Sequence, residues 1–207
     1  FGERVAFVSG DESLTYQQLF DAAGRTAMYL RNSDCEHVAM LDVSSLALPI
    51  ALFASAWAGK PFVPINYRLT DTEVDALLQR IQPAMLVTDK TRIESSPDMA
   101  AAALLERDAF VGLSIKEGGA AENDWTMDPD DIAVLLFTSG TTGAPKAAVL
   151  RHRHLVSYMF SAAEFGAAAA DDVALVAVPP YHIAGVISVI SSVYAGRRVV
   201  QLPNFNA

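Results

Sequence analysis

Short apolar segments alternate with longer segments of helical spacing along this chain, and this alternation limits the fold more than any other feature. Seven of the short segments are rich in valine, leucine and isoleucine, as buried strands are. They are Arg4–Ser9, His37–Val43, Lys60–Ile65, Pro83–Asp89, Asp130–Thr138, Asp172–Val178 and Arg197–Leu202. Strands that alternate with helices form mainly parallel sheets, because each helix returns the chain to the same edge and covers a face. We therefore expect an α/β fold of mainly parallel sheets flanked by helices.

Two of the longer segments begin with a capping box, in which a threonine and the residue three positions later satisfy each other's backbone donors. The pairs are Thr15 with Gln18 and Thr70 with Glu73, and they predict helices within residues 14–30 and 69–81. The apolar residues after the second pair share one helical face, which predicts packing against a sheet. They are Val74, Leu77, Leu78 and Ile81.

The composition excludes some classes of protein. The 207 residues are 52% hydrophobic and 19% charged, as in an ordinary soluble globular protein. The net charge of −9 argues against a surface that binds nucleic acid or anionic lipid. The apolar run over residues 45–59 is too short to span a bilayer, so we expect no transmembrane segment. The single cysteine, Cys35, cannot form an internal disulfide, which favours the cytoplasm.

The organisation of the chain suggests one domain with a possible internal division. Residues 116–131 are polar, include a Gly-Gly pair and predict a surface connection, at which we place a subdomain boundary. The chain opens with Phe1, almost inside a strand-like run and without a charged leader. We therefore expect a piece of a longer protein without a signal peptide.

The stretch TSGTTGAPK, residues 138–146, has the composition of a phosphate-binding loop. Its glycines allow backbone N–H groups to approach an anion, and its hydroxyls and Lys146 add donors and a positive charge. The spacing does not fit the common nucleotide P-loop, since Pro145 stands where the second glycine belongs and Ala147 replaces the metal-binding hydroxyl. This disfavours a kinase or NTPase of that class. From the residues alone, a surface turn between two strands stays an alternative.

Four stretches together resemble one family. TSGTTGAPK is nearly identical to the signature loop of the AMP-forming adenylating enzymes, which include acyl- and aryl-CoA synthetases, peptide-synthetase adenylation domains and firefly-type luciferases. The stretches LTYQQL (residues 14–19), AGKPFVPINYRLT (58–70) and PPYHIAG (179–185) resemble further motifs of that family, in the family's order. The resemblance covers the whole chain and implies an incomplete N-terminal domain of an adenylate-forming enzyme.

The resemblance implies a reaction and a set of residues that perform it. In this family a carboxylic acid attacks the α-phosphate of ATP, and in the ligases coenzyme A then displaces AMP from the acyl-adenylate. The loop would hold the β- and γ-phosphates together with Mg²⁺, with Lys146 as the catalytic charge clamp. Its phosphate-binding residues would be Thr138, Ser139, Gly140, Thr141, Thr142, Gly143 and Lys146. No residue is assigned as a magnesium ligand, and we expect a modest effect from Ala147, which stands where the family usually has glycine.

The motif at residues 179–185 helps to choose the substrate class. Amino-acid-activating members carry an aspartate there to pair with the substrate ammonium, whereas this chain has His182. The sequence thus favours a fatty or other apolar carboxylate, and the resemblance implies that His182 and Gly185 border the acyl pocket. A core-facing histidine at the start of a helix stays an alternative for His182. By the same resemblance, His152 matches a family histidine that opens the helix after the loop.

The family's later motifs are absent from residues 1–207. They are the Y-G-x-T-E segment, the ribose-binding aspartate and the C-terminal domain with its catalytic lysine. We therefore expect this chain alone to form no acyl-adenylate, and we expect exposed apolar surface to drive its self-association. Two alternatives for the parent protein stay open: an acyl-AMP ligase that loads a carrier protein, and a non-catalytic nucleotide-binding or scaffold protein.

Overall fold

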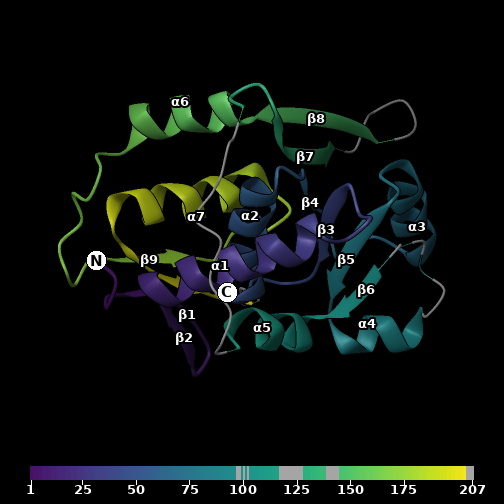
Figure 1. The fold of residues 1–207 in the computed structure, drawn as a ribbon, viewed down its shortest axis with the longest axis horizontal. Helices are drawn as coiled ribbons and strands as arrows, with labels where there is room; N and C mark the ends of the chain where they lie inside the picture. Colours follow the sequence, from purple (N-terminus) through teal and green to yellow (C-terminus); the bar gives the residue numbers. More distant parts are fainter. Residues whose placement is uncertain (97–98, 100, 102, 117–127, 139–144, 204–207) are drawn as a thin grey trace.

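The computed structural model consists of two mainly parallel sheets with helices between and around them (Figure 1). It describes residues 1–96, 99, 101, 103–116, 128–138 and 145–203. The first sheet has the order β2-β1-β10-β9 and the second the order β6-β5-β3-β4-β7-β8. Every neighbouring pair is parallel except β1 with β2 and β7 with β8. The expected fold class is confirmed.

The strands and helices have the following bounds. The four-stranded sheet contains β1 (Val5–Ser9), β2 (Glu12–Thr15), β9 (Val173–Val176) and β10 (Arg198–Gln201). The six-stranded sheet contains β3 (His37–Leu41), β4 (Phe62–Pro64), β5 (Ala84–Thr88), β6 (Ala103–Glu106), β7 (Ile132–Thr138) and β8 (Lys146–Arg151). The helices are α1 (Tyr16–Arg31), α2 (Ala47–Ala58), α3 (Asp71–Arg80), α4 (Lys90–Ser95), α5 (Arg107–Ile115), α6 (His152–Ala162) and α7 (Ile183–Ala195).

All seven predicted strands are present, and the structure adds β2, β6 and β8. Each of these three is an edge strand with one neighbouring strand. Edge strands carry shorter apolar runs than central strands, and the sequence prediction relied on such runs. The prediction that all seven strands are buried is wrong for β9. Leu175 in β9 is 63% exposed, because β9 has only β10 as a neighbour and forms the edge of its sheet.

Both predicted capping boxes are formed. The Thr15 side chain accepts a hydrogen bond from the Gln18 backbone at the start of α1, and the Thr70 side chain accepts one from Glu73 at the start of α3. The predicted apolar face of α3 is buried against the six-stranded sheet, in a cluster with Leu41, Leu86 and Leu135. α3 is thereby fixed beside the strands that carry the loop.

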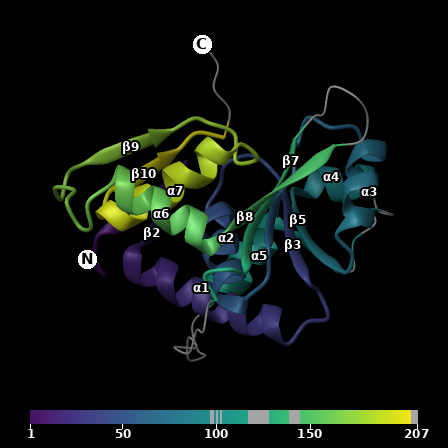
Figure 2. The ribbon, with the colours of Figure 1, turned by 90° about the horizontal axis from the view of Figure 1, so that it is seen from above.

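The main core lies between the two sheets and is built around α2 (Figure 2). Nine of the twelve residues of α2 are buried, so this helix is apolar nearly all round. Side chains from both sheets join it in one cluster, among them Phe7 from β1, Phe62 from β4 and Val199 from β10. α7 adds Val186 and Val189 to the same cluster. The core therefore joins α7, which begins within the segment 179–185, with β7, which ends at Thr138.

The segment 116–131 connects α5 with β7, and strands on either side of it, β6 and β7, belong to the same sheet. Residues 117–127 lie outside the described part of the chain, and the subdomain boundary stays a prediction. Among the described helices, none has both the length and the apolar run that crossing a bilayer requires.

Candidate functional site

Three of the four motif segments meet around one cavity of about 560 Å³. The segment 58–70 contributes Asn66 and Leu69, the two ends of the loop contribute Thr138 and Pro145, and the segment 179–185 contributes Tyr181 and His182. β4 and β7 are parallel neighbours, so the residues that follow them reach the same edge of the sheet. The sheet thus brings the first two segments together, and the third reaches the cavity at the start of α7.

The two ends of the loop are held together by the β7–β8 pair. Thr138 is the last residue of β7 and lies opposite Lys146, the first residue of β8. The Thr138 hydroxyl donates to the Lys146 carbonyl at 3.3 Å, and Lys146 is exposed. Ser139, Gly140, Thr141, Thr142 and Gly143, the other predicted phosphate-binding residues, lie outside the described part of the chain.

Arg80 is a residue of this site that the motifs do not contain. It ends α3 and lines the cavity, its Nη1 donates to the Pro145 carbonyl at 2.6 Å, and its Cζ lies 4.9 Å from the centre of the Phe137 ring. The one sequence signal is a basic residue at a helix C-terminus, which is common for electrostatic reasons and points to no site. The contact with Pro145 spans 65 positions and depends on the fold.

His182 lies at the start of α7 and is exposed, so the alternative of a core-facing histidine is wrong. Its ring centre is 4.5 Å from that of Tyr181, which in turn meets Tyr67 edge-on at 5.3 Å. The backbone carbonyl of His182 accepts from the Gly185 N–H at 2.9 Å, which starts the helix. The histidine thus forms part of an aromatic wall of the cavity.

The packing of α7 requires glycine at position 185, whether or not a ligand is bound. A Cβ atom at this position would lie 2.7 Å from the Pro179 carbonyl oxygen, closer than real Cβ contacts, so only glycine lets α7 approach the segment before it. Gly185 is buried. Its assignment to the acyl pocket stays a prediction.

The fourth motif, at residues 14–19, lies elsewhere and has a structural role. Leu14 is buried, Thr15 caps α1, and the Tyr16 hydroxyl donates to the Arg197 carbonyl at 2.8 Å. Burial raises the pKa of Tyr16 to about 12, with Arg4 and Arg197 opposing the shift. The motif therefore ties α1 to the start of β10.

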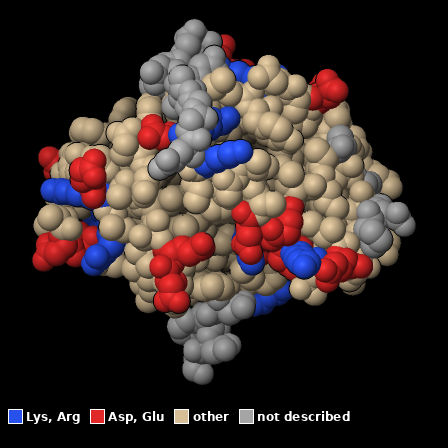
Figure 3. Space-filling view, turned by 60° about the horizontal axis from the view of Figure 1, so that its bottom comes forward, with Lys and Arg blue, Asp and Glu red and all other residues tan. Residues whose placement is uncertain are grey.

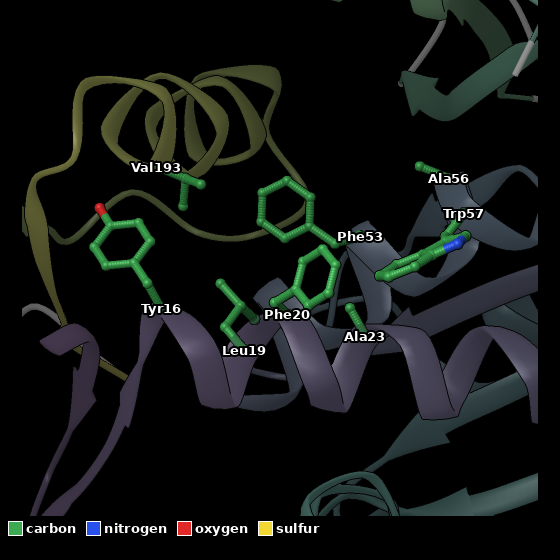
Figure 4. Close-up of a pocket in the computed structure, with 8 residues that line it drawn as sticks. All are labelled: Tyr16, Leu19, Phe20, Ala23, Phe53, Ala56, Trp57 and Val193. Carbon is green, nitrogen blue, oxygen red and sulfur yellow. The ribbon is translucent and has the colours of Figure 1, made fainter. Parts of the chain in front are cut away.

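Tyr16 also borders a second cavity, of about 280 Å³, between α1, α2 and α7 (Figure 4). Apart from the Tyr16 hydroxyl and the Trp57 indole nitrogen its walls are hydrocarbon, with Leu19, Phe20 and Phe53 in the centre. No charged residue lines it among the described residues. A phosphate would lose its hydration there without compensation, so this cavity does not suit a nucleotide tail.

A polar crevice lies where β3, β5 and β6 end, at about 410 Å³. In it the Arg107 Nη1 contacts both carboxylate oxygens of Asp42 at 3.2 Å, and the Asp42 side chain is 2% exposed. Burial raises the pKa of Asp42 to about 6, against the opposing effect of Arg107. The desolvation of this carboxylate therefore outweighs its ion pair.

The remaining ionisable candidates form no further site. His152 is half-buried and begins α6, and burial lowers its pKa while Asp131 opposes the shift. Among the described residues, no three His, Cys, Asp or Glu side chains come together as a metal site. On the face seen in Figure 3, acidic and basic side chains lie in small mixed groups, without a continuous basic surface on its described part.

The whole chain matches one protein family. The model of the AMP-binding enzyme family covers residues 1–207. This chain belongs to that family. The resemblance of the four motifs is thereby confirmed.

Individual relatives of the family show how much of an enzyme the chain represents. Indoleacetate–CoA ligase of Aromatoleum aromaticum is 30% identical over 212 residues, which cover 95% of this chain and 42% of that protein. The fatty acid–[acyl-carrier-protein] ligase ScoC of Streptomyces coeruleorubidus is 32% identical over 208 residues, which cover 94% of this chain and 40% of that protein. The crystal structure of ATP-bound MatB from Rhodopseudomonas palustris superimposes with a TM-score of 0.83 at 27% identity, over 99% of this chain and 43% of that one. The chain thus spans less than half the length of these relatives and has the fold of their N-terminal part.

Proposed function

We propose that the protein containing this chain is an ATP-dependent ligase that activates a carboxylic acid as acyl-AMP and transfers the acyl group to coenzyme A. The proposal is carried by the single cavity around which the loop ends and the segments 58–70 and 179–185 gather. Membership of the AMP-binding enzyme family and the CoA ligases among the relatives support it. The small-molecule partners would be ATP, the acid and coenzyme A.

The loop would hold the part of ATP that leaves. Attack of the carboxylate on the α-phosphate breaks the bond to the β-phosphate, and negative charge accumulates on the departing pyrophosphate. Lys146, exposed beside the cavity, would stabilise that charge, and Thr138 with residues 139–143 would donate hydrogen bonds to the phosphates. Mg²⁺ would enter with the phosphates of ATP and neutralise part of their charge, and we assign it no protein ligand.

The walls of the cavity suit an apolar acid. Leu69, Leu77 and Ile183 line it, and the segment 179–185 holds no aspartate that would pair with an α-amino group. A fatty or other apolar carboxylate fits this lining, with His182 near the reacting carboxylate and Gly185 behind it. We place the ligase in the cytoplasm, because the one cysteine of residues 1–207 is a buried free thiol.

A carrier protein is the second candidate for the acyl acceptor. The similarity to a fatty acid–[acyl-carrier-protein] ligase, at 32% identity, favours it as much as other relatives favour coenzyme A. The two are separated by offering the same acyl-adenylate to coenzyme A and to a phosphopantetheinylated carrier protein. The acceptor that speeds AMP release is the physiological class.

The test of the proposal is acid-dependent exchange of pyrophosphate into ATP by the full-length gene product, across a panel of acids. The family's adenine-binding and C-terminal motifs lie outside residues 1–207, so the chain alone serves as the inactive control. Lys146→Ala should lower the exchange rate by about a hundredfold or more, as the loss of a transition-state donor does. Lys90→Ala is the matched control, because Lys90 is an exposed lysine that pairs with Glu94 on α4.

Three results would contradict the proposal. Pyrophosphate exchange without any acid would contradict the proposed activation of a carboxylic acid. Full exchange by Lys146→Ala would contradict the role assigned to Lys146. A folded full-length protein that binds ATP and exchanges nothing would be the non-catalytic nucleotide-binding protein instead.

A further inference from the structure

A single guanidinium contacts β7 next to the start of the loop and the residue directly before β8. Arg80 donates to the carbonyl of Pro145, the residue directly before Lys146, and lies over the ring of Phe137, the residue directly before Thr138. Thr138 and Lys146 lie opposite each other in the β7–β8 pair. The position of Arg80 is therefore defined against both ends of the loop at once.

Both contacts depend on the geometry of arginine. The planar guanidinium donates in its own plane while its face rests on an aromatic ring, which lysine cannot reproduce in full. Arg80 is also held from its own side, since α3 is capped at Thr70 and packs its apolar face into the core. The contact thus connects the rigid core to the backbone at Pro145.

We propose that Arg80 is a positioning residue, which fixes the backbone at Pro145 and thereby directs the Lys146 side chain toward the phosphates of ATP. This inference rests on the proposed function for its catalytic meaning. Arg80 itself acts through Lys146. Without it, the β7–β8 end would sample other orientations, and Lys146 would spend less time in the productive one.

The first test reads the position of the strand without any substrate. Hydrogen–deuterium exchange of the full-length protein is followed at the backbone amides of Lys146, Ala147 and Ala148. Arg80→Ala should speed exchange there about tenfold or more, because local opening loses a charge-assisted hydrogen bond. Arg25→Ala is the matched control, since Arg25 also donates to a backbone carbonyl, that of Ser114 at 2.9 Å, on the α1–α5 side of the molecule.

The second test reads the consequence for the reaction. In pyrophosphate exchange, Arg80→Ala should lower kcat/KM for ATP by about tenfold to a hundredfold, with the KM for the acid unchanged. Arg80→Lys should recover part of the loss, since it keeps a donor and a positive charge. In a Lys146→Ala background, Arg80→Ala should add almost nothing, because a residue that acts through Lys146 has no further effect once the ammonium is gone.

The following results would overturn the positioning role of Arg80. Unchanged amide exchange in Arg80→Ala overturns the positioning role. Faster amide exchange with unchanged kinetics reduces Arg80 to a structural residue and also overturns it, as does an additive loss in the double variant. If the wild-type protein itself exchanges no pyrophosphate, the proposed function fails, and the role of Arg80 in directing Lys146 toward ATP is overturned with it.

Discussion

Asp42 carries its carboxylate at a position that water hardly reaches, and its titration should therefore be visible in the stability of the protein. Its side chain is 2% exposed, and burial raises its pKa to about 6 despite the nearby Arg107. The folded state thus favours the protonated form more than the unfolded chain does. The contribution of Asp42 to stability is fully present below the unfolded pKa and is lost as the pH rises through about 6.

The Asp42→Asn variant should remove this pH dependence. Between pH 4 and 7 the free energy of unfolding of the wild type should fall relative to that of the variant by about 2 kcal/mol, most of the free energy equivalent to the full pKa shift. Urea unfolding at a series of pH values measures the difference. Asp108→Asn is the control, because Asp108 also contacts Arg107 but its side chain is 79% exposed. Parallel pH profiles for wild type and Asp42→Asn would contradict the expectation.

Single residues also show how one motif can hold two kinds of information. The motif at 179–185 marks His182, whose ring lines the cavity, and Gly185, whose missing side chain allows the approach of Pro179. The sequence pattern does not separate these two reasons. Arg80 is the opposite case, since no pattern marks it and only the fold brings it to Pro145.

At the scale of elements, sequence patterns predicted a helix or strand correctly where the interactions that form it lie within the element itself. The capping boxes at Thr15 and Thr70 predicted the starts of α1 and α3 because both partners of each bond lie within four residues. β6 and β8 were not predicted, because each becomes a strand only through a neighbour that the fold supplies.

The cap of α1 provides a test of the local rule. Thr15→Ala removes the side-chain oxygen that accepts from the Gln18 backbone at 3.1 Å, and it should lower the free energy of unfolding by about 1 kcal/mol. Thr15→Ser keeps that acceptor and should stay close to the wild type. Chemical denaturation of the three proteins at one temperature measures the effect. If serine cost as much as alanine, the threonine methyl group rather than the cap would account for the loss.

At the scale of the whole molecule, the sequence identified the segments of the candidate site but did not predict how they are placed relative to one another. The motifs predicted the family and the residue types of the loop. Two of the three segments reach the cavity because β4 and β7 are neighbours in one sheet, and the third reaches it because α7 packs in the core between the two sheets. The fourth motif was equally conspicuous in the sequence and lies in a helix start away from that cavity. The fold is therefore needed to tell which of several equally clear sequence motifs line the site and which have a structural role.

The outer surface of the smaller sheet determines how residues 1–207 behave as an isolated chain. β9 forms an edge of that sheet, and its side chains Val173 and Leu175 are 45% and 63% exposed. Phe165, 71% exposed, adds a further apolar side chain to the surface. An edge strand with unpaired backbone groups and apolar side chains is a template for pairing with another copy.

We therefore expect the isolated chain to self-associate in a concentration-dependent way, and Leu175→Lys to weaken that association. A charge on an edge strand opposes pairing, because it would have to be desolvated against the second copy. Light scattering across a dilution series measures the mass of both proteins. Glu12→Lys is the control, because it changes a charge at the opposite edge strand, β2, and should leave the association in place. A wild-type chain that keeps the monomer mass at every concentration would contradict the expectation.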